Sequence, residues 1–361
     1  MLLSDIAKQA RVSPATVSRA INQPEIVAPA SLERIRAVMR ALDYQPPPLS
    51  RRRGPKSRRP ATLEIGLWCV GSRVNHEEFQ WFQNQVSELQ ERGPLSRVNL
   101  RTIFSPTPKI CPQVLTDGKL DGVIIQGMPP APEVMALIPN LPKVWFMTRR
   151  SRAFPGDYVE PDNEENGAIA ANHLADRGHR TVAVLASTPD YSATIRRINA
   201  FVEQAKVRGL ETHTILGEEN PDIGFLTVAP PGREIEQLVS DLVTLDPRPT
   251  GLYLPSDHFA GAFFRTLRSA GQRVDRDYDV ILGNYNPQIY CNLEHQPAAV
   301  DIHLATLIRR VLEQITWRID NPTCPGRVGV AVSPSLRLPP TPTPTPVTET
   351  PDALAVAPAT V

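Results

Sequence analysis

Residues 4–22 read SDIAKQARVSPATVSRAIN, and this pattern predicts two short helices joined by a tight turn. Ser13 is a good N-cap residue, and Pro14 suits the first position of the second helix, where no N–H is needed. The exposed side of that helix would carry short polar groups and Arg19, which can approach base edges and phosphates in a DNA major groove. The alternative is a solvated helical hairpin at the start of a globular domain.

A small core is predicted beneath these helices, because apolar residues recur at helical spacing. They are Ile6, Ala7, Ala10, Val12, Val17, Ala20 and Ile21, followed by Leu32, Ile35, Val38, Met39 and Leu42 in a third helix that ends before Pro46. Residues 1–60 contain twelve Lys and Arg against four Asp and Glu, an excess of eight positive charges, although the whole chain carries only +1. A compact basic head on a mildly acidic body favours a polyanionic partner for the head.

Several features restrict the class of protein. With 361 residues, the chain is long enough for two or more domains. No apolar run is long enough to span a membrane, and Asp5 and Lys8 precede any apolar stretch, so we expect no signal peptide, no membrane partner and a cytoplasmic location. The four cysteines lie far apart and form no C-x-x-C pair, which indicates reduced thiols and not disulfides or metal ligands.

The head carries a specific set of motifs. They are D-I-A-x-x-A at Asp5–Ala10, V-S-x-x-T-V-S-R at Val12–Arg19, and L-x-Y-x-P at Leu42–Pro46. Together they make residues 1–46 resemble the helix-turn-helix DNA-binding domain of the LacI/GalR (lactose repressor) family of bacterial transcription regulators. The resemblance implies DNA contacts by Ser4, Ser13, Pro14, Ala15, Thr16, Ser18, Arg19 and Asn22.

The resemblance also implies a role for each contact. Pro14 and Ala15 would face base edges, and Arg19 would bind a guanine through two hydrogen bonds. Thr16, Ser18 and Asn22 would hold the sugar–phosphate backbone, which sets the register without reading sequence. The alternatives are that the Thr16 hydroxyl bonds within the helix and that Arg19 lies along the surface.

Two departures from the family pattern affect stability. Arg11 stands where the family usually has Gly, and a left-handed backbone there costs a non-Gly residue roughly 1–2 kcal/mol. Ala28 stands where the family often has a Ser that caps the third helix, and losing such a cap typically costs about 1 kcal/mol.

Residues 47–62 form a basic Pro/Arg hinge or linker. Where the family continues with a hinge helix whose Leu enters the minor groove, this chain has Arg53, and Gly54–Pro55 would stop any helix within two turns. An ordinary flexible linker is the alternative. We expect Arg51, Arg52 and Arg53 to act as a basic arm attracted by phosphates and by the minor-groove potential.

The body, residues 63–338, alternates between two kinds of segment. Apolar runs typical of buried parallel strands occur at 65–70, 121–126, 143–147, 181–186, 250–254 and 279–283. Amphipathic stretches of helical length occur at 76–92, 164–177, 192–208, 232–244 and 257–270. This alternation predicts an α/β body with parallel sheets, and its length favours two subdomains. Residues 339–361 are low-complexity Pro/Thr sequence, for which we expect a disordered tail.

The resemblance continues more loosely into the body. D-N-x-x-N-G-A-x-x-A-A-x-H-L-x-x-x-G-H-R at Asp162–Arg180 matches the most distinctive body motif of the family, which implies a periplasmic-binding-protein-like fold with an effector cleft. Arg197 and Asp257 match positions that grip sugar hydroxyls in relatives. Arg149 and Tyr285 are further candidates for binding the effector, although Tyr285 replaces the usual carboxylate and Ser256 the usual Asn. A structural salt bridge between Arg197 and Asp257 is the alternative.

The sequence favours a sequence-specific transcription regulator, with repression as the family default. A homodimer would read a pseudo-palindromic operator, and a small, carbohydrate-related effector would change its affinity for DNA. One alternative is a small-molecule receptor whose DNA-binding head is vestigial or non-specific. An enzyme would need a nucleophile, a phosphate-binding loop or a metal-spaced cluster, and we find none, so we expect no catalytic residues, no metal and no cofactor.

The basic arm predicts only weak bending of DNA. Because Arg53 stands where the wedge-forming Leu would be, a gel-shift bending assay should show no sharp central kink in the operator. A kink as large as that of wedge-inserting relatives would contradict this expectation.

Overall fold

The computed structural model describes residues 3–22, 24, 27–42, 44, 62–71, 83–84, 86–88, 91, 98–147, 156–187, 191–217 and 232–339. The chain divides into two compact units, Met1–Thr62 and Leu63–Val361, which we call the head and the body. Four predicted binding residues, Arg51, Arg52, Arg53 and Arg149, lie outside the described residues, as does the chain from residue 340. In the described part, no helix combines the length and the apolar character needed to cross a membrane.

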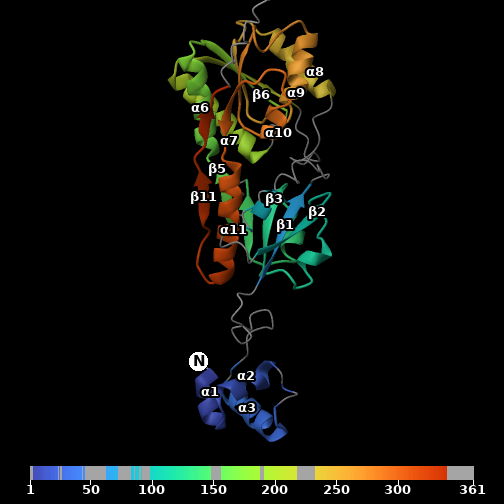
Figure 1. Ribbon diagram of the computed structural model, residues 1–361, viewed down its shortest axis with the longest axis vertical. Helices are drawn as coiled ribbons and strands as arrows, with labels where there is room; N and C mark the ends of the chain where they lie inside the picture. The colour runs from blue at the N-terminus through green and yellow to red at the C-terminus, as the bar shows by residue number, and fades with distance from the viewer. Residues whose placement is uncertain are drawn as a thin grey trace, which may run out of the picture. The chain divides into compact units, whose positions relative to one another are not determined.

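The head contains three helices, α1 (Leu3–Ala10), α2 (Pro14–Asn22) and α3 (Pro29–Ala41) (Figure 1). Ile6, Val17 and Ile35, one from each helix, are completely buried against one another. The helical spacing of these residues therefore gives the predicted core, and the small-helix architecture of the head is confirmed.

The turn between α1 and α2 depends on two adjacent residues. The Thr16 N–H donates to Ser13 Oγ at 3.1 Å, so Ser13 caps α2 as its position predicts. Arg11 has φ of 53°, in the left-handed region that favours glycine. Its side chain therefore costs the head roughly 1–2 kcal/mol. At the start of α3, Ala28 makes no side-chain cap, as expected for alanine.

The body contains two six-stranded sheets, each forming one lobe (Figure 1). The first lobe has the strand order β11-β5-β4-β3-β1-β2, and the second lobe has the order β12-β10-β9-β8-β6-β7. All neighbours pair in parallel except β10 and β12. The strands of the first lobe are β1 (Leu63–Val70), β2 (Val98–Ser105), β3 (Gly122–Gly127), β4 (Lys143–Phe146), β5 (Asp157–Pro161) and β11 (Gly329–Val332). Those of the second lobe are β6 (Thr181–Ala186), β7 (Glu211–Leu216), β8 (Gly251–Leu254), β9 (Asp279–Leu282), β10 (Ala298–Asp301) and β12 (Ser335–Arg337).

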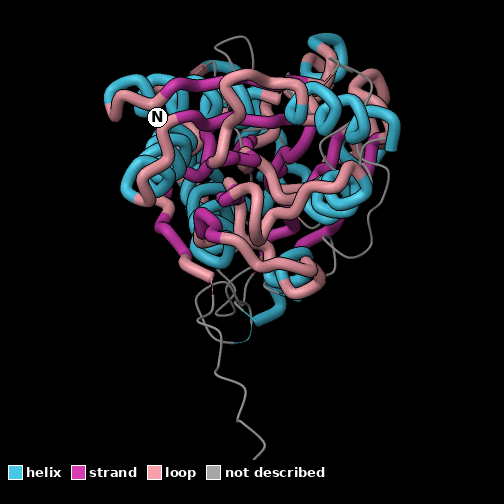
Figure 2. The backbone as a smooth tube through the Cα atoms, turned by 90° about the horizontal axis from the view of Figure 1, so that it is seen from above, coloured by secondary structure: helices cyan, strands magenta, loops and turns pink. Residues whose placement is uncertain are grey.

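Helices cover both faces of the second sheet (Figure 2). On one face, α6 (Asn163–Asp176) and α7 (Ser192–Val207) pack through Leu174 and Phe201. On the other, α8 (Gly232–Val243) and α9 (Ala260–Ser269) pack through Leu238 and Phe263. This arrangement, with near-continuous apolar strands between helical layers, confirms the predicted α/β body.

The first sheet has one long helix and several short ones. The face with α11 (Leu304–Asp320) packs through Leu307, Val311 and Ile315. The opposite face of this sheet is covered by the 3₁₀ turn η4 (Gln113–Leu115) and by α5 (Pro132–Met135). The second lobe also contains a short helix, α10 (Pro287–Tyr290). Of the helix predicted at 76–92, the described residues 83–84, 86–88 and 91 are helical.

The chain passes between the lobes at three places. It leaves the first sheet after β5 to enter α6, returns from β10 to α11, and crosses again between β11 and β12. Beside the first crossing, the buried carboxylate of Glu160 on β5 forms an ion pair with Arg196 on α7. Each lobe is therefore assembled from separate stretches of sequence.

Candidate DNA-contact surface and effector site

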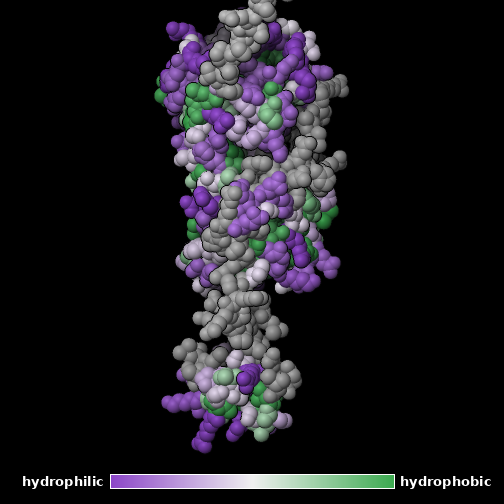
Figure 3. All heavy atoms as spheres, viewed as in Figure 1, coloured by the Kyte–Doolittle hydropathy of each residue, from purple (hydrophilic) through white to green (hydrophobic). Residues whose placement is uncertain are grey.

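The outer face of α2 presents the residues expected to meet DNA. Ala15 and Arg19 are exposed, and the Arg19 guanidinium has no hydrogen bond or ion pair within the described part of the chain. Thr16 Oγ1 lies 2.8 Å from Ser13 Oγ, so the alternative of a bond within the helix is realised in the free protein. Hydrophilic side chains project from the head in Figure 3.

The remaining head candidates have different surroundings. Ser13 and Pro14 are exposed at the start of α2, and Ser18 is half-buried. Ser4 lies within α1 and Asn22 lies within α2, but the structure does not describe their side chains. The structure thus brings Ser13, Pro14, Ala15 and Arg19 to one accessible helix.

The second candidate site lies at the carboxyl edge of the second sheet. Asp257 follows β8, Asn284 follows β9, and Arg197 comes from the first half of α7, the helix that follows β6. Since β9, β8 and β6 are parallel neighbours, the loops after them meet at this one edge.

Arg197 is almost completely buried, with 4% of its surface exposed. Its Nε donates to Asn163 Oδ1 at 2.7 Å, and its Nη1 donates to Pro255 O at 2.6 Å and to Asn284 Oδ1 at 2.9 Å. A longer contact from Nη1 reaches Gly283 O at 3.3 Å. Nη2 makes no hydrogen bond to any described residue, so its two N–H donors are left for another molecule.

Asp257 is also buried, but its carboxylate is held weakly. Asn284 Nδ2 lies 3.5 Å from Oδ1, and the Asn286 N–H donates to Oδ2 at 3.2 Å. Burial raises the pKa of this carboxyl above its ordinary value. Both contacts are long, so the carboxylate keeps acceptor capacity for a further donor.

Asn284 stands between the two charged groups. It accepts from Arg197 through Oδ1 and donates toward Asp257 through Nδ2. The predicted alternative of a direct salt bridge between Arg197 and Asp257 is therefore wrong for these two residues. The arrangement leaves the Nη2 donors of Arg197 free and the Asp257 carboxylate with room for a further donor. The formal charges of these two side chains cancel.

Backbone packing fixes the edge that carries Asn284. Gly283 O accepts from Asn166 Nδ2 at 2.8 Å, and Asn166 Oδ1 accepts from the Tyr253 hydroxyl at 2.7 Å. A Cβ atom at Gly283 would collide with the backbone of Pro255, which requires glycine at this position. The loops after β8 and β9 therefore approach more closely than side chains would permit.

Tyr285, predicted at this site, has its own partners. The Arg337 guanidinium lies 4.0 Å above its ring, and Tyr290 packs edge-on at 5.0 Å. No hydrogen bond joins Tyr285 to Arg197 or Asp257 among the described residues. Tyr285 follows Asn284 directly, so it flanks the Arg197–Asn284–Asp257 group.

Three asparagines were not assigned a site role from sequence, namely Asn163, Asn166 and Asn284. The first two belong to the D-N-x-x-N motif, whose second and fifth positions could have indicated them. Asn284 had no local signal beyond its place after an apolar strand.

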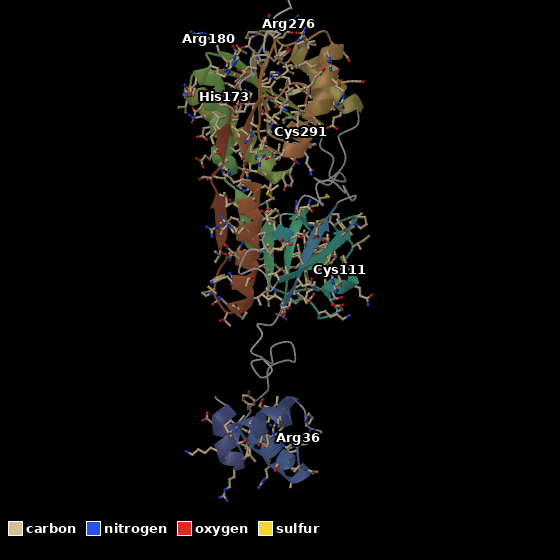
Figure 4. The ribbon with its side chains drawn as sticks, viewed as in Figure 1. Arg36, Cys111, His173, Arg180, Arg276 and Cys291 are labelled. Atoms are coloured by element: carbon tan, nitrogen blue, oxygen red, sulfur yellow. The ribbon has the colours of Figure 1, made fainter. Side chains whose placement is uncertain are left out.

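In the described part of the chain, the cysteines and possible metal ligands form no further candidate site. All four cysteines are free thiols, and Cys111 and Cys291 lie in different lobes (Figure 4). Within the described ranges, no three His, Cys, Asp or Glu side chains are grouped to hold a metal ion.

The chain combines a three-helix head with a two-lobed body, and two family models match these parts. Residues 2–47 match bacterial regulatory proteins of the lacI family, and residues 171–338 match the periplasmic binding protein-like domain. The chain belongs to the LacI family of DNA-binding transcription regulators, a non-enzymatic family, and carries an effector-binding domain.

Two repressors are similar to this chain over most of their length. The chain is 24% identical over 286 residues to the HTH-type transcriptional repressor PurR of Vibrio atlanticus, covering 77% of this chain and 80% of that protein. It is 22% identical over 339 residues to PurR of Haemophilus influenzae, covering 88% and 91%.

Solved structures share the fold. A complex of the transcriptional regulator CelR with cellobiose superposes with a TM-score of 0.61 at 21% identity, covering 94% of this chain and 98% of that one. A LacI family regulator from Enterococcus faecium with bound ribose gives a TM-score of 0.61 at 18% identity, covering 76% and 96%. The lac repressor dimer bound to operator and the anti-inducer ONPF gives 0.58 at 18%, covering 93% and 97%.

The Arg197 contacts predict a large effect on stability. Arg197→Ala should lower the free energy of unfolding by on the order of 3 kcal/mol, because it leaves several buried acceptors without donors. Urea unfolding followed by circular dichroism measures this difference. Arg208→Ala, at the end of the same helix, is the control, since it removes only exposed contacts, an ion pair with Asp176 and a hydrogen bond to Asn172. This change should alter stability by less than about 1 kcal/mol. Equal losses in the two variants would contradict the assignment.

Proposed function

We propose that this protein is a homodimeric repressor that binds a pseudo-palindromic operator. A neutral, carbohydrate-related effector would change its affinity for that operator. Residues 1–46 would bind DNA, 47–62 would link, and 63–338 would bind effector and form the dimer. Such a regulator works in the cytoplasm, where the chromosome is. The free donors of Arg197 beside the underused Asp257 carboxylate are the observation that carries the effector part of this proposal.

The DNA part rests on α2. Arg19 is exposed and unpaired within the described head, so its guanidinium is available to a guanine. Ala15 is exposed on the same face and leaves room for a base edge. The Thr16 hydroxyl would exchange its bond to Ser13 for one to a phosphate, and Ser4, Ser18 and Asn22 would also hold the backbone. Two such heads, related by the dimer axis, would read two half-sites.

The effector part rests on charge and hydrogen-bond capacity. A ligand at this edge meets N–H donors from Arg197 and an acceptor from Asp257, with Asn284 between them. An anion would lie against the buried Asp257 carboxylate, which disfavours it. Adjacent hydroxyls of a neutral sugar supply both an acceptor and a donor, and two solved relatives hold cellobiose and ribose. Tyr285 and Arg149 would add further contacts to the effector.

Effector binding would change DNA affinity by favouring one arrangement of the body. The effector can shift the operator equilibrium only by the difference between its affinities for the two arrangements. Linkage makes the effect reciprocal, so DNA must change effector affinity by the same factor.

Arg19→Ala tests the DNA part. On an operator selected by the full chain from random duplex DNA, the variant should bind about 10–100-fold more weakly, because one two-bond guanine contact is lost. Its binding to unrelated DNA should change far less. Arg34→Ala is the matched control, since it removes the same charge from α3, where Arg34 bonds Ser31. If no sequence is selected, the receptor with a vestigial head replaces this proposal.

Thermal unfolding with named ligands tests the effector part. D-ribose or cellobiose should stabilise the full chain, by about 2.7 kcal/mol at a hundredfold excess over Kd, and should alter operator footprints. The anionic sugar D-glucuronate should do neither. Stabilisation by glucuronate alone, or by the purine hypoxanthine alone, would exclude a neutral carbohydrate.

A further inference from the structure

A histidine beside the effector site joins two neighbouring strands. His258 Nδ1 lies 2.6 Å from Ser256 Oγ, and its Nε2 lies 3.2 Å from Ser187 Oγ. Ser187 follows β6 and Ser256 follows β8, and these strands are paired in the second sheet. The imidazole therefore links the two loops just where their strands diverge into α7 and α9.

The imidazole of His258 is partly buried, and the side chains around it are more deeply buried. The two serines are buried, with 3% and 5% of their surfaces exposed. Phe259 packs edge-on against the imidazole at 5.4 Å. Burial lowers the pKa of His258 to about 4, so the ring is neutral at physiological pH. A neutral imidazole has one donor and one acceptor nitrogen, which suits a hydroxyl on each side.

This bridge brackets Asp257. Among the other described residues, the carboxylate contacts Asn284 and the Asn286 N–H, and both contacts are long, so they would not fix its direction alone. The residues on either side of it, Ser256 and His258, are bonded to each other, and His258 is anchored to Ser187 on the next strand.

We propose that His258 is a positioning residue of the effector site, which holds the loop after β8 against the loop after β6 and so aims the Asp257 carboxylate. This inference rests on the proposed effector site but not on the effector being a carbohydrate. If His258 has this role, the contact from Asp257 to the Asn286 N–H depends on both hydrogen bonds of the ring, through Nδ1 to Ser256 and through Nε2 to Ser187.

Hydrogen exchange on the full chain tests this, because it needs no ligand. His258→Leu removes both bonds at similar volume, and His258→Gln keeps one donor and one acceptor in its amide. We expect amide exchange in the segment 283–290 to rise about tenfold in His258→Leu and to stay within about threefold of the natural protein in His258→Gln.

A second histidine provides the control for general destabilisation. His179 bonds Thr250 at 2.8 Å and Asp279 at 3.1 Å, at the amino ends of β8 and β9, opposite the ends that carry His258 and Asn284. His179→Leu should therefore loosen the lobe without a selective change at 283–290. Uniform exchange throughout the lobe in His258→Leu, or no change at 283–290, would overturn the positioning role.

Calorimetric titration with D-ribose and cellobiose separates the two proposals. If the natural protein binds either sugar, His258→Leu should weaken that binding about tenfold and His258→Gln should restore most of it. Unaltered affinity in His258→Leu would also overturn the positioning role. If the natural protein binds neither sugar, the carbohydrate assignment fails, and the exchange result alone decides the role of His258.

Discussion

The body depends on one buried guanidinium. Arg197 connects α6, the loop after β8 and the loop after β9 through Asn163, Pro255 and Asn284. A buried charge is tolerated when it is hydrogen-bonded, and four acceptors on three segments bind the Nε and Nη1 groups of Arg197. Because the same group also keeps free donors, the interaction that closes the second lobe is also the one that a ligand would meet first.

Adjacent residues of α7 serve different purposes. Successive side chains on a helix point about 100° apart, so Arg196 and Arg197 face different neighbours. Arg197 reaches the edge of the second sheet, whereas Arg196 pairs with buried Glu160 on β5 of the first lobe. The helix thus connects the candidate site with the first crossing between the lobes through contacts of two adjacent residues.

Much of the fold was predictable from local pattern, but less of the site. Helical spacing identified Ile6, Val17 and Ile35, and apolar runs identified the central strands, because burial imposes a period on the sequence. Asn284 and His258 could not be found in this way. Asn284 meets Arg197 from 87 residues away, and His258 meets Ser187 from 71 residues away. Such contacts follow from strand order, which local spacing does not contain.

The three crossings between the lobes have a consequence for biosynthesis. The first lobe takes β1 to β5 from the early part of the body, yet α11 and β11 come from residues after the second lobe. During synthesis, the hydrophobic face under α11 therefore stays uncovered until the chain has been made as far as Asp320. During that interval, the second lobe has almost all of its strands while the first exposes Val144, Phe146 and Val159, a window in which chaperones would bind.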